Sequence, residues 1–246
     1  MASARPELSI RLPLYVTLVW LTLVGRGLSA TEPYRALSPS GEPPHPAVLL
    51  VPGCSGFAAT NGVNVYEERG SDLQARGYLV VFVDYIGRRM QTNCAHVSLA
   101  EVSTDILEAA AWVRERSDAD PARISVIGWS YGGGGVLAAL KSLTVGPPFA
   151  KAVMYYPVCR GATPWSTDVT GLMLLGEKDD IAFPKLCSPV ATGMAPDRLR
   201  IITYANARHG FDLRGLPERA NSPSGSSGHN AEADKAAWST VLDFLR

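Results

Sequence analysis

The segment GWSYGGGG, from Gly128 to Gly135, contains the residue types of a nucleophilic serine site. Gly128, Ser130 and Gly132 form a GxSxG pattern directly after the apolar run RISVI. In this pattern a tight strand-to-helix turn presents the serine hydroxyl outward, and small neighbours make the turn possible. A phosphate-binding loop would need a lysine and a hydroxyl residue after its glycines, whereas VLAAL follows Gly135. The segment also lacks the middle glycine of the dinucleotide-binding fingerprint. The pattern therefore favours a serine nucleophile.

A serine nucleophile requires a base and an orienting acid, which are expected further along the chain in the order serine, acid, histidine. Only His209 and His229 follow Ser130. His209 comes directly after the strand-like run RIITYA and its loop, whereas His229 lies in a Gly/Ser-rich segment with nothing to hold it. We therefore predict His209 as the base that accepts the serine proton.

Two adjacent carboxylates end the run LMLLGEKDD, which follows a predicted strand. Asp179, three residues past Gly176, is the predicted acid. Its role would be to hold the imidazole tautomer and to stabilise the imidazolium that forms during attack. Asp180 remains the alternative, and one of the two is interpreted as a solvated loop carboxylate.

Two backbone N–H groups are expected to stabilise the negative oxygen that develops during attack on a carbonyl. One belongs to the residue after the nucleophile, Tyr131, and the other to a turn after an earlier strand. The turn VPGCSGF matches this position and predicts the N–H of Cys54 as the second donor. A disulfide at Cys54 would fasten the turn and argues against Cys54 as a nucleophile.

The elements that must position these residues alternate between strand and helix. Continuous apolar runs of strand length indicate strands that are covered on both faces, as in parallel sheets. The predicted strands are 47–51, 77–85, 123–129, 150–156, 171–177 and 198–205. The predicted helices are 64–77, 99–113, 132–141, 184–193 and 232–246, the second of them capped by Ser98 and Glu101.

This alternation predicts an α/β fold with a mostly parallel, doubly wound sheet flanked by helices. We expect a single domain over 31–246, with its core at about 45–246 and its site in the loops beyond the carboxyl ends of the strands. The polar segment 214–230 is interpreted as a mobile loop.

The first 30 residues predict a secretory signal peptide that is cleaved after Ala30. Arg5 and Arg11 precede an apolar run, and only 14 uncharged residues separate Arg11 from Arg26, fewer than the roughly 20 that span a bilayer. An uncleaved anchor is the alternative. We expect an exported protein, periplasmic or secreted, with no stable membrane span after cleavage. Zero formal net charge argues against nucleic acid as a partner.

The four cysteines form an even set, which favours disulfides in an exported chain. No pair has the close spacing of a zinc site, and neither a metal nor another cofactor is implied. Three pairings are possible. We prefer Cys54 with Cys94 and Cys159 with Cys187, because each pair would join loops that leave the same end of a parallel sheet.

Four motifs of the chain resemble those of the dienelactone hydrolase family of the α/β-hydrolase fold. VLLVPGCSGF resembles the first glycine-rich turn of the family, GWSYGGGG its nucleophile turn, LLGEKDD its acid turn and HGFD its histidine turn. The resemblance covers about 45–246 and implies a hydrolase without a large lid domain, with Ser130, Asp179 and His209 as a triad. The founding enzymes have cysteine at the nucleophile and a glutamate where this chain has Pro52 and Gly53. The placement of the cysteines and the predicted signal peptide resemble an exported, serine-bearing branch of the family.

The predicted activity is hydrolysis of small carboxylic esters or lactones through an acyl-enzyme intermediate. A peptidase or an acyltransferase on the same triad, or a non-catalytic secreted binding protein of the same fold, are the alternatives. The loop residues that could line a substrate pocket are Tyr85, Arg88, Arg89, Tyr131 and Trp165. The two arginines could meet a substrate carboxylate, or they could be solvated loop side chains.

Overall fold

The structure is a computed structural model that describes Met1 and residues 32–143, 146–193 and 195–246. The predicted signal peptide and its cleavage site lie outside the described residues. The unit from Pro33 to Arg246 contains all of the predicted site residues and is described below.

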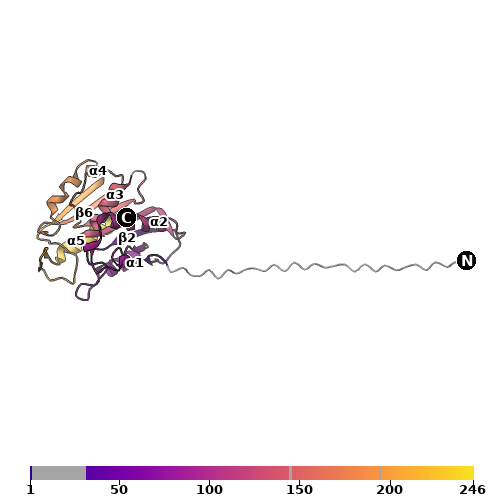
Figure 1. Cartoon of the computed structure of the whole chain (residues 1–246), viewed down its shortest axis with the longest axis horizontal. Coiled ribbons are helices and arrows are strands. Elements are labelled where there is room, and N and C mark those ends of the chain that lie inside the picture. The colour runs from indigo at the N-terminus through magenta and orange to yellow at the C-terminus, as the bar shows by residue number, and fades with distance from the viewer. Residues whose placement is uncertain (2–31, 144–145, 194) are drawn as a thin grey trace. The chain divides into compact units, whose positions relative to one another are not determined.

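A seven-stranded sheet forms the centre of this unit, with the strand order β1-β3-β2-β4-β5-β6-β7 (Figure 1). Only β1 pairs in the antiparallel direction, with β3, and every other pair in this sheet is parallel. The predicted doubly wound α/β sheet is thereby confirmed. The strands are β1 (Arg35–Leu37), β2 (His45–Val51), β3 (Leu79–Phe82), β4 (Ala119–Trp129), β5 (Lys151–Tyr155), β6 (Thr170–Gly176) and β7 (Leu199–Tyr204).

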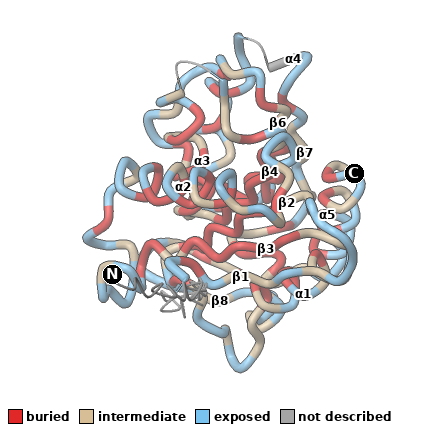
Figure 2. Tube along the Cα trace, turned by 90° about the vertical axis from the view of Figure 1, so that its right-hand side faces the viewer, coloured by how far each residue is buried: buried red, intermediate tan, exposed pale blue. Residues whose placement is uncertain are grey.

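Helices cover both faces of the sheet. The helices α2 (Leu99–Arg114) and α3 (Tyr131–Ser142) share one buried core with the sheet, and α1 (Val65–Ala75) and α5 (Ala231–Leu245) share the other. Because successive side chains of a strand point to opposite faces, Leu49 lies in the first core and its neighbour Leu50 in the second. The strands β2, β3, β5 and β6 and the C-terminal half of β4 are almost entirely buried (Figure 2).

The start of α2 has the predicted capping box. The side chain of Ser98 accepts from the backbone N–H of Glu101, and the Glu101 carboxylate accepts from the N–H of Ser98. These two bonds satisfy N–H groups that the first turn of a helix leaves without intrahelical partners. They fix the point at which the chain enters α2, directly after the loop that follows β3.

Two predicted segments differ from the structure. The segment 214–230, interpreted as a mobile loop, contains a hairpin formed by β8 (Ala220–Ser222) and β9 (Gly225–Ser227). Its short polar strands lack the apolar alternation by which a strand is recognised in a sequence. The helix predicted over 184–193 is a 3₁₀ segment, η3 (Pro184–Ala191), with Pro189 inside it. The remaining short helices are η1 (Gly87–Arg89), η2 (Cys94–His96) and α4 (Ala195–Arg198).

Candidate active site

Ser130 occupies a strained turn between β4 and α3. Its φ is +49°, in the left-handed region that non-glycine residues rarely adopt. A Cβ atom at Gly132 would lie 2.3 Å from the carbonyl oxygen of Pro52, and one at Gly128 would lie 2.8 Å from the backbone of Gly133. Both positions therefore require glycine because of close backbone approach, which explains the GxSxG pattern. The turn places Ser130 beyond the carboxyl end of β4, at the N-terminus of α3.

His209 and Asp179 lie in line with the Ser130 hydroxyl. The Oγ of Ser130 is 2.8 Å from Nε2 of His209, and Nδ1 of His209 is 2.8 Å from Oδ2 of Asp179. The other oxygen of Asp179 accepts from the backbone N–H groups of Ile181 and Ala182 at 2.9 and 2.8 Å. The Asp179 residue is only 4% exposed, so its carboxylate is held in one orientation toward the imidazole.

Asp180, the alternative acid, turns away from His209. Its carboxylate accepts from the backbone N–H of Ser226 at 2.6 Å and from the Ser226 hydroxyl at 2.9 Å. The backbone N–H of Ser226 is the main cause that lowers the pKa of Asp180 below its ordinary value. Asp180 is exposed in its loop, as expected for the solvated carboxylate of the pair, and it also accepts hydrogen bonds from the β8–β9 hairpin.

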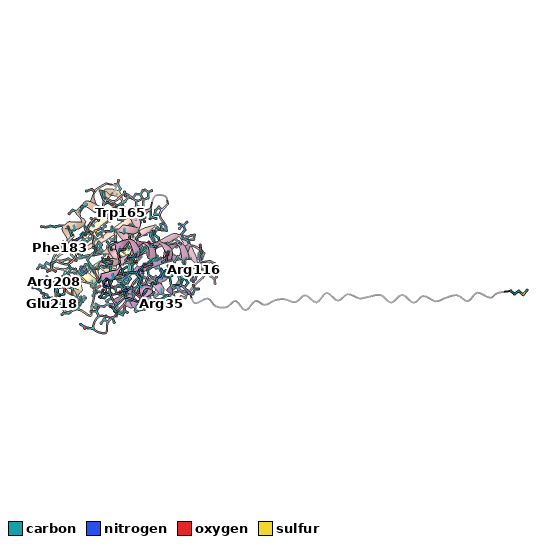
Figure 3. The ribbon with its side chains drawn as sticks, viewed as in Figure 1. Arg35, Arg116, Trp165, Phe183, Arg208 and Glu218 are labelled. Atoms are coloured by element: carbon teal, nitrogen blue, oxygen red, sulfur yellow. A yellow bond between two sulfur atoms is a disulfide. The ribbon has the colours of Figure 1, made fainter. Side chains whose placement is uncertain are left out.

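The β8–β9 hairpin also holds the backbone around His209. The N–H of Gly228 donates to the carbonyl oxygen of His209 at 3.0 Å. Nη1 of Arg208, a residue labelled in Figure 3, donates to the Ser226 hydroxyl at 2.9 Å. His209 and Ser227 form a parallel β-bridge. The segment expected to be mobile is thus paired with the loop that carries the candidate base.

His229 is held as well, although not at the candidate site. Its N–H donates to the carbonyl oxygen of Pro217 at 3.0 Å, and its Nε2 is 3.4 Å from Oδ2 of Asp234 in α5. The reasoning that nothing holds His229 is therefore wrong. The choice of His209 as candidate base is supported by its position next to Ser130.

The turn after β2 passes directly beside Ser130. A Cβ atom at Gly53 would lie 3.5 Å from the Cβ of Ser130. The N–H of Gly53 donates to the hydroxyl of Tyr66 at 3.1 Å, and the hydroxyl of Tyr85 donates to the carbonyl oxygen of Gly53 at 2.9 Å. Burial raises the pKa of Tyr85, which keeps its hydroxyl protonated as a donor. Because the C=O and N–H of one peptide point in opposite directions, Tyr85 also fixes the direction of the Cys54 N–H.

Both N–H groups that the sequence suggests as oxyanion donors are unengaged. Within the described part of the chain, neither the N–H of Tyr131 nor that of Cys54 donates to a backbone or side-chain acceptor. Tyr131 is the first residue of α3, where the helix N-terminus carries a partial positive charge. Both groups are available to an acceptor atom from outside the chain.

The structure contains both preferred disulfides. Cys54 and Cys94 join the turn after β2 to η2, with 4.7 Å between their Cα atoms. Cys159 and Cys187 join the loop after β5 to η3, with 5.0 Å between their Cα atoms. The N–H of Cys94 also donates to the carbonyl oxygen of Cys54 at 2.9 Å. Each bond therefore connects two loops at the carboxyl edge of the sheet.

The family model of the dienelactone hydrolase family matches residues 34–246. The chain belongs to this family. The match includes every candidate site residue described above, and the confirmed sheet agrees with the fold of the family.

Solved structures with dienelactone hydrolase and esterase names share the fold of this family member. A dienelactone hydrolase-like promiscuous phosphotriesterase from metagenomic libraries is 16% identical, with a TM-score of 0.65 over 83% of this chain and 87% of that chain. A thermophilic esterase from Thermogutta terrifontis is 15% identical, with a TM-score of 0.59 over 86% of this chain and 87% of that chain. At these identities the likeness concerns the fold.

A curated relative shares more sequence over a shorter stretch. The protein named "Probable dipeptidyl-aminopeptidase B" from Colletotrichum graminicola is 38% identical over 113 residues, which are 42% of this chain. The matched stretch is 12% of the length of that relative. This dienelactone hydrolase family member therefore matches only a small part of that much longer relative.

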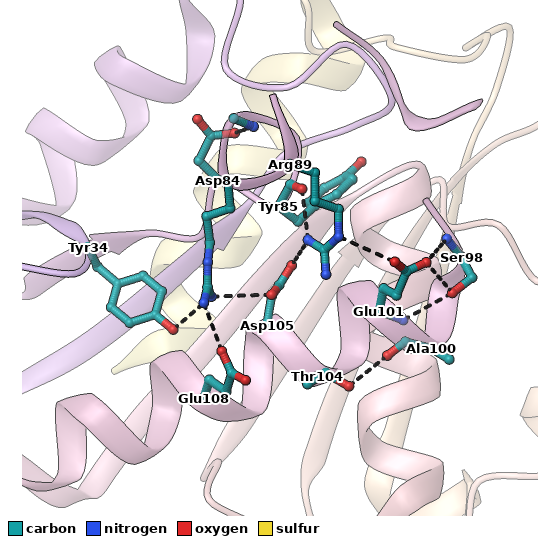
Figure 4. Close-up of polar contacts among 12 residues, drawn as sticks. Tyr34, Asp84, Tyr85, Arg89, Ser98, Ala100, Glu101, Thr104, Asp105 and Glu108 are labelled. Atoms are coloured by element: carbon teal, nitrogen blue, oxygen red, sulfur yellow. Dashed lines mark hydrogen bonds and ion pairs between the residues drawn. The ribbon is translucent and has the colours of Figure 1, made fainter. Parts of the chain in front are cut away.

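Arg88 and Arg89, two of the loop residues that could line a substrate pocket, form ion pairs within this family member. Figure 4 shows the contacts of Arg89. Arg88 pairs with Asp105 and Glu108 of α2 at 3.2 and 2.9 Å, and Arg89 pairs with Asp105 and donates to the carbonyl oxygen of Tyr85 at 2.9 Å. Arg88 is exposed and Arg89 is partly exposed, and both side chains are ion-paired within the chain. They fasten the loop after β3, which carries Tyr85, to α2.

Besides Tyr85, described above, the other two loop residues differ in their relation to Ser130. Tyr131 follows Ser130 and donates from its hydroxyl to the carbonyl oxygen of Val97. Trp165 is buried and lines a cleft between α3 and the loop after β5, and the described lining of that cleft includes neither Ser130 nor His209. We therefore find Tyr131, but not Trp165, beside the candidate site.

Two further observations concern membrane spans and metal sites in this family member. Among the described residues, no helix combines the length and apolar character needed to cross a membrane. The same residues contain no group of three or more His, Cys, Asp or Glu side chains that could hold a metal ion.

Proposed function

We propose that this member of a hydrolase family is a serine hydrolase that cleaves small carboxylic esters or lactones. The observation that carries the proposal is the alignment of Ser130, His209 and Asp179, with two successive contacts of 2.8 Å. A hydroxyl within hydrogen-bond reach of an imidazole that a carboxylate orients is the arrangement that activates a serine for attack on a carbonyl carbon.

The proposed reaction proceeds in two halves. Ser130 Oγ attacks the ester carbonyl carbon while Nε2 of His209 takes the hydroxyl proton, and the same proton then passes to the departing alcohol. Water then attacks the acyl carbon while His209 takes a proton from it. The bond between the acyl carbon and Ser130 Oγ breaks, His209 returns the proton to Oγ, and the carboxylic acid leaves. Asp179 would stabilise the imidazolium that exists at each step.

The unengaged N–H groups of Tyr131 and Cys54 support an oxyanion-stabilising role. Negative charge develops on the carbonyl oxygen as the tetrahedral intermediate forms, and preorganised donors stabilise it without reorganisation. The turn of the second donor passes close to the nucleophile, since a Cβ atom at Gly53 would lie 3.5 Å from the Cβ of Ser130. The bond from Tyr85 to Gly53 and the disulfide at Cys54 preorganise that turn.

A fluorophosphonate probe tests the proposal directly. We expect stoichiometric labelling of the purified protein, located by mass spectrometry on the peptide that contains Ser130, because the probe reacts only with an activated serine. Heat-denatured protein is the control and should stay unlabelled. Native protein that resists the probe would count against any serine hydrolase activity and would favour a binding protein of the same fold.

The test substrate is chosen from the structural likeness. The Thermogutta terrifontis esterase structure carries bound butyrate, a short carboxylate. We therefore propose p-nitrophenyl butyrate as the first ester. A peptidase remains the second candidate, because the curated relative with 38% identity is named as an aminopeptidase. Parallel assays with a dipeptide p-nitroanilide separate the two by the ratio of kcat/KM values.

We also propose export of the protein, which the two disulfides support, since disulfides persist in oxidising compartments. Cleavage after Ala30 is expected to give a mature chain that starts at Thr31. Intact-mass and N-terminal peptide measurements on protein from the exported fraction check this. A chain that retains Met1 in that fraction would instead support the uncleaved anchor.

A further inference from the structure

A second buried carboxylate lies behind the candidate active site. Asp212 is fully buried and follows His209 by three residues in the HGFD motif. No ion pair to this carboxylate is formed among the described residues. A buried carboxylate without a paired cation is costly, because burial removes its hydration. Its presence therefore calls for a specific task.

The hydrogen-bond donors around Asp212 indicate that task. The indole N–H of Trp129 donates to Oδ2 at 2.7 Å, and the hydroxyl of Tyr156 donates to Oδ1. An ionised carboxylate is an acceptor only, so it satisfies both donors at once, whereas an asparagine would turn an NH₂ group toward one of them. Burial raises the pKa of Asp212, and the bonds from Tyr156 and Trp129 act against that rise.

These two donors are direct neighbours of the candidate catalytic groups. Trp129 immediately precedes Ser130 and is completely buried. The ring of Tyr156 meets the imidazole of His209 edge to face, with 4.7 Å between the ring centroids. Asp212 thus connects the end of β4, the end of β5 and the histidine loop through two hydrogen bonds.

The backbone at Tyr156 shows that this position is held under strain. Tyr156 has a φ of +34°, which is unfavourable for an aromatic residue. Its N–H donates to the carbonyl oxygen of Leu174, and the preceding carbonyl, that of Tyr155, accepts from the N–H of Ser130 at 2.9 Å. A strained residue persists where its surroundings determine its conformation, and the bond to Asp212 is one of those determinants.

We propose that Asp212 is a positioning residue that sets the location of Ser130 through Trp129 and of His209 through Tyr156. This inference rests on the proposed function. The Ser130–His209 distance then depends on one carboxylate that touches neither substrate nor the transferred proton. Asp212 differs in this from Asp179, which contacts the imidazole itself.

Steady-state kinetics of Asp212→Asn on p-nitrophenyl butyrate test the proposal. We expect kcat to fall about 100-fold, the effect of a misplacement on the order of 1 Å, while KM changes less than about threefold. The chain offers a matched control in Asp72, which accepts from the indole N–H of Trp238 at 2.7 Å between α1 and α5. Asp72→Asn makes the same chemical change to an aspartate–tryptophan pair and should retain wild-type kcat.

A second variant tests the same contact in case Asp212→Asn does not fold. Tyr156→Phe keeps the ring beside His209 and removes only the hydroxyl that Asp212 binds. We expect kcat to fall about 10-fold, and the double variant to be no slower than Asp212→Asn, because both changes break the same contact. Wild-type kcat in Tyr156→Phe, or equal kcat in folded Asp212→Asn and Asp72→Asn, would overturn the proposal.

A spectroscopic readout separates this inference from the proposed function. In protein labelled with ¹⁵N-histidine, the Nδ1–H resonance of His209 reports its bond to Asp179 whether or not the protein turns over esters. We expect Asp212→Asn to shift or broaden this resonance and Asp72→Asn to leave it in place. An unmoved resonance in Asp212→Asn contradicts the positioning role, whereas an inactive wild-type protein contradicts only the ester hydrolase activity.

Discussion

Replacing Ser130 by alanine is expected to lower kcat for p-nitrophenyl butyrate by about four to six orders of magnitude. The substitution removes Oγ, the atom that would form the acyl-enzyme bond. Alanine has the same Cβ atom as serine, so the backbone should keep its φ near +49°. The free energy of unfolding should therefore change by less than about 1 kcal/mol. Stopped-time ester assays and thermal melts of both proteins measure the two quantities.

Retention of more than a tenth of the wild-type rate by Ser130→Ala would show that another group carries the hydrolysis. The Ser142→Ala variant serves as a control, since the Ser142 hydroxyl only donates to the carbonyl oxygen of Ala139 at the end of α3. Its kcat should equal that of the wild type.

Replacing Asp179 by asparagine is expected to lower kcat by about 10⁴-fold. Oδ1 of the amide can still accept from Ile181 and Ala182. Its NH₂ group then faces Nδ1 of His209 and favours the imidazole tautomer with a proton on Nε2. That tautomer cannot take the proton of Ser130. The loss should therefore appear in kcat and should not be recovered by raising the substrate concentration.

The neighbouring carboxylate provides the comparison. Asp180→Asn removes charge from the contact with Ser226 while leaving the contact between His209 and Asp179 intact. We expect a loss in kcat of less than about tenfold, as for a residue outside the reacting groups. If Asp180→Asn, and not Asp179→Asn, lost four orders of magnitude, the acid would have been assigned to the wrong residue.

Much of the fold follows from local patterns in the chain. The buried strands β2, β5 and β6 and the end of β4 contain apolar runs, which indicate parallel strands. The capping box at Ser98 marks the start of α2. The proximity of Ser130, Asp179 and His209 was predictable for a related reason. Each follows the carboxyl end of a strand, and in a parallel sheet these ends meet at one edge.

Other features depend on contacts between distant segments that no local pattern encodes. Asp180 and Ser226 are 46 residues apart, and no local sequence pattern at either residue predicts their hydrogen bond. The pairing of Arg88 with Asp105 depends on how the loop after β3 meets α2, which the charges alone leave open. Asp212 is the last residue of the HGFD motif, but the sequence does not predict its burial, because that burial results from the packing of distant segments.

If the protein is exported as proposed, the Cys54–Cys94 disulfide has a consequence for when the candidate active site is completed. Both of these cysteines are partly exposed, whereas Cys159 and Cys187 are buried, so the bond beside the candidate oxyanion turn is the one that solvent reductants reach first. While the chain is still in the reducing cytoplasm, that turn is expected to be unfastened. Under the proposed export, oxidation would then fasten the candidate oxyanion turn only after the chain has left the cytoplasm.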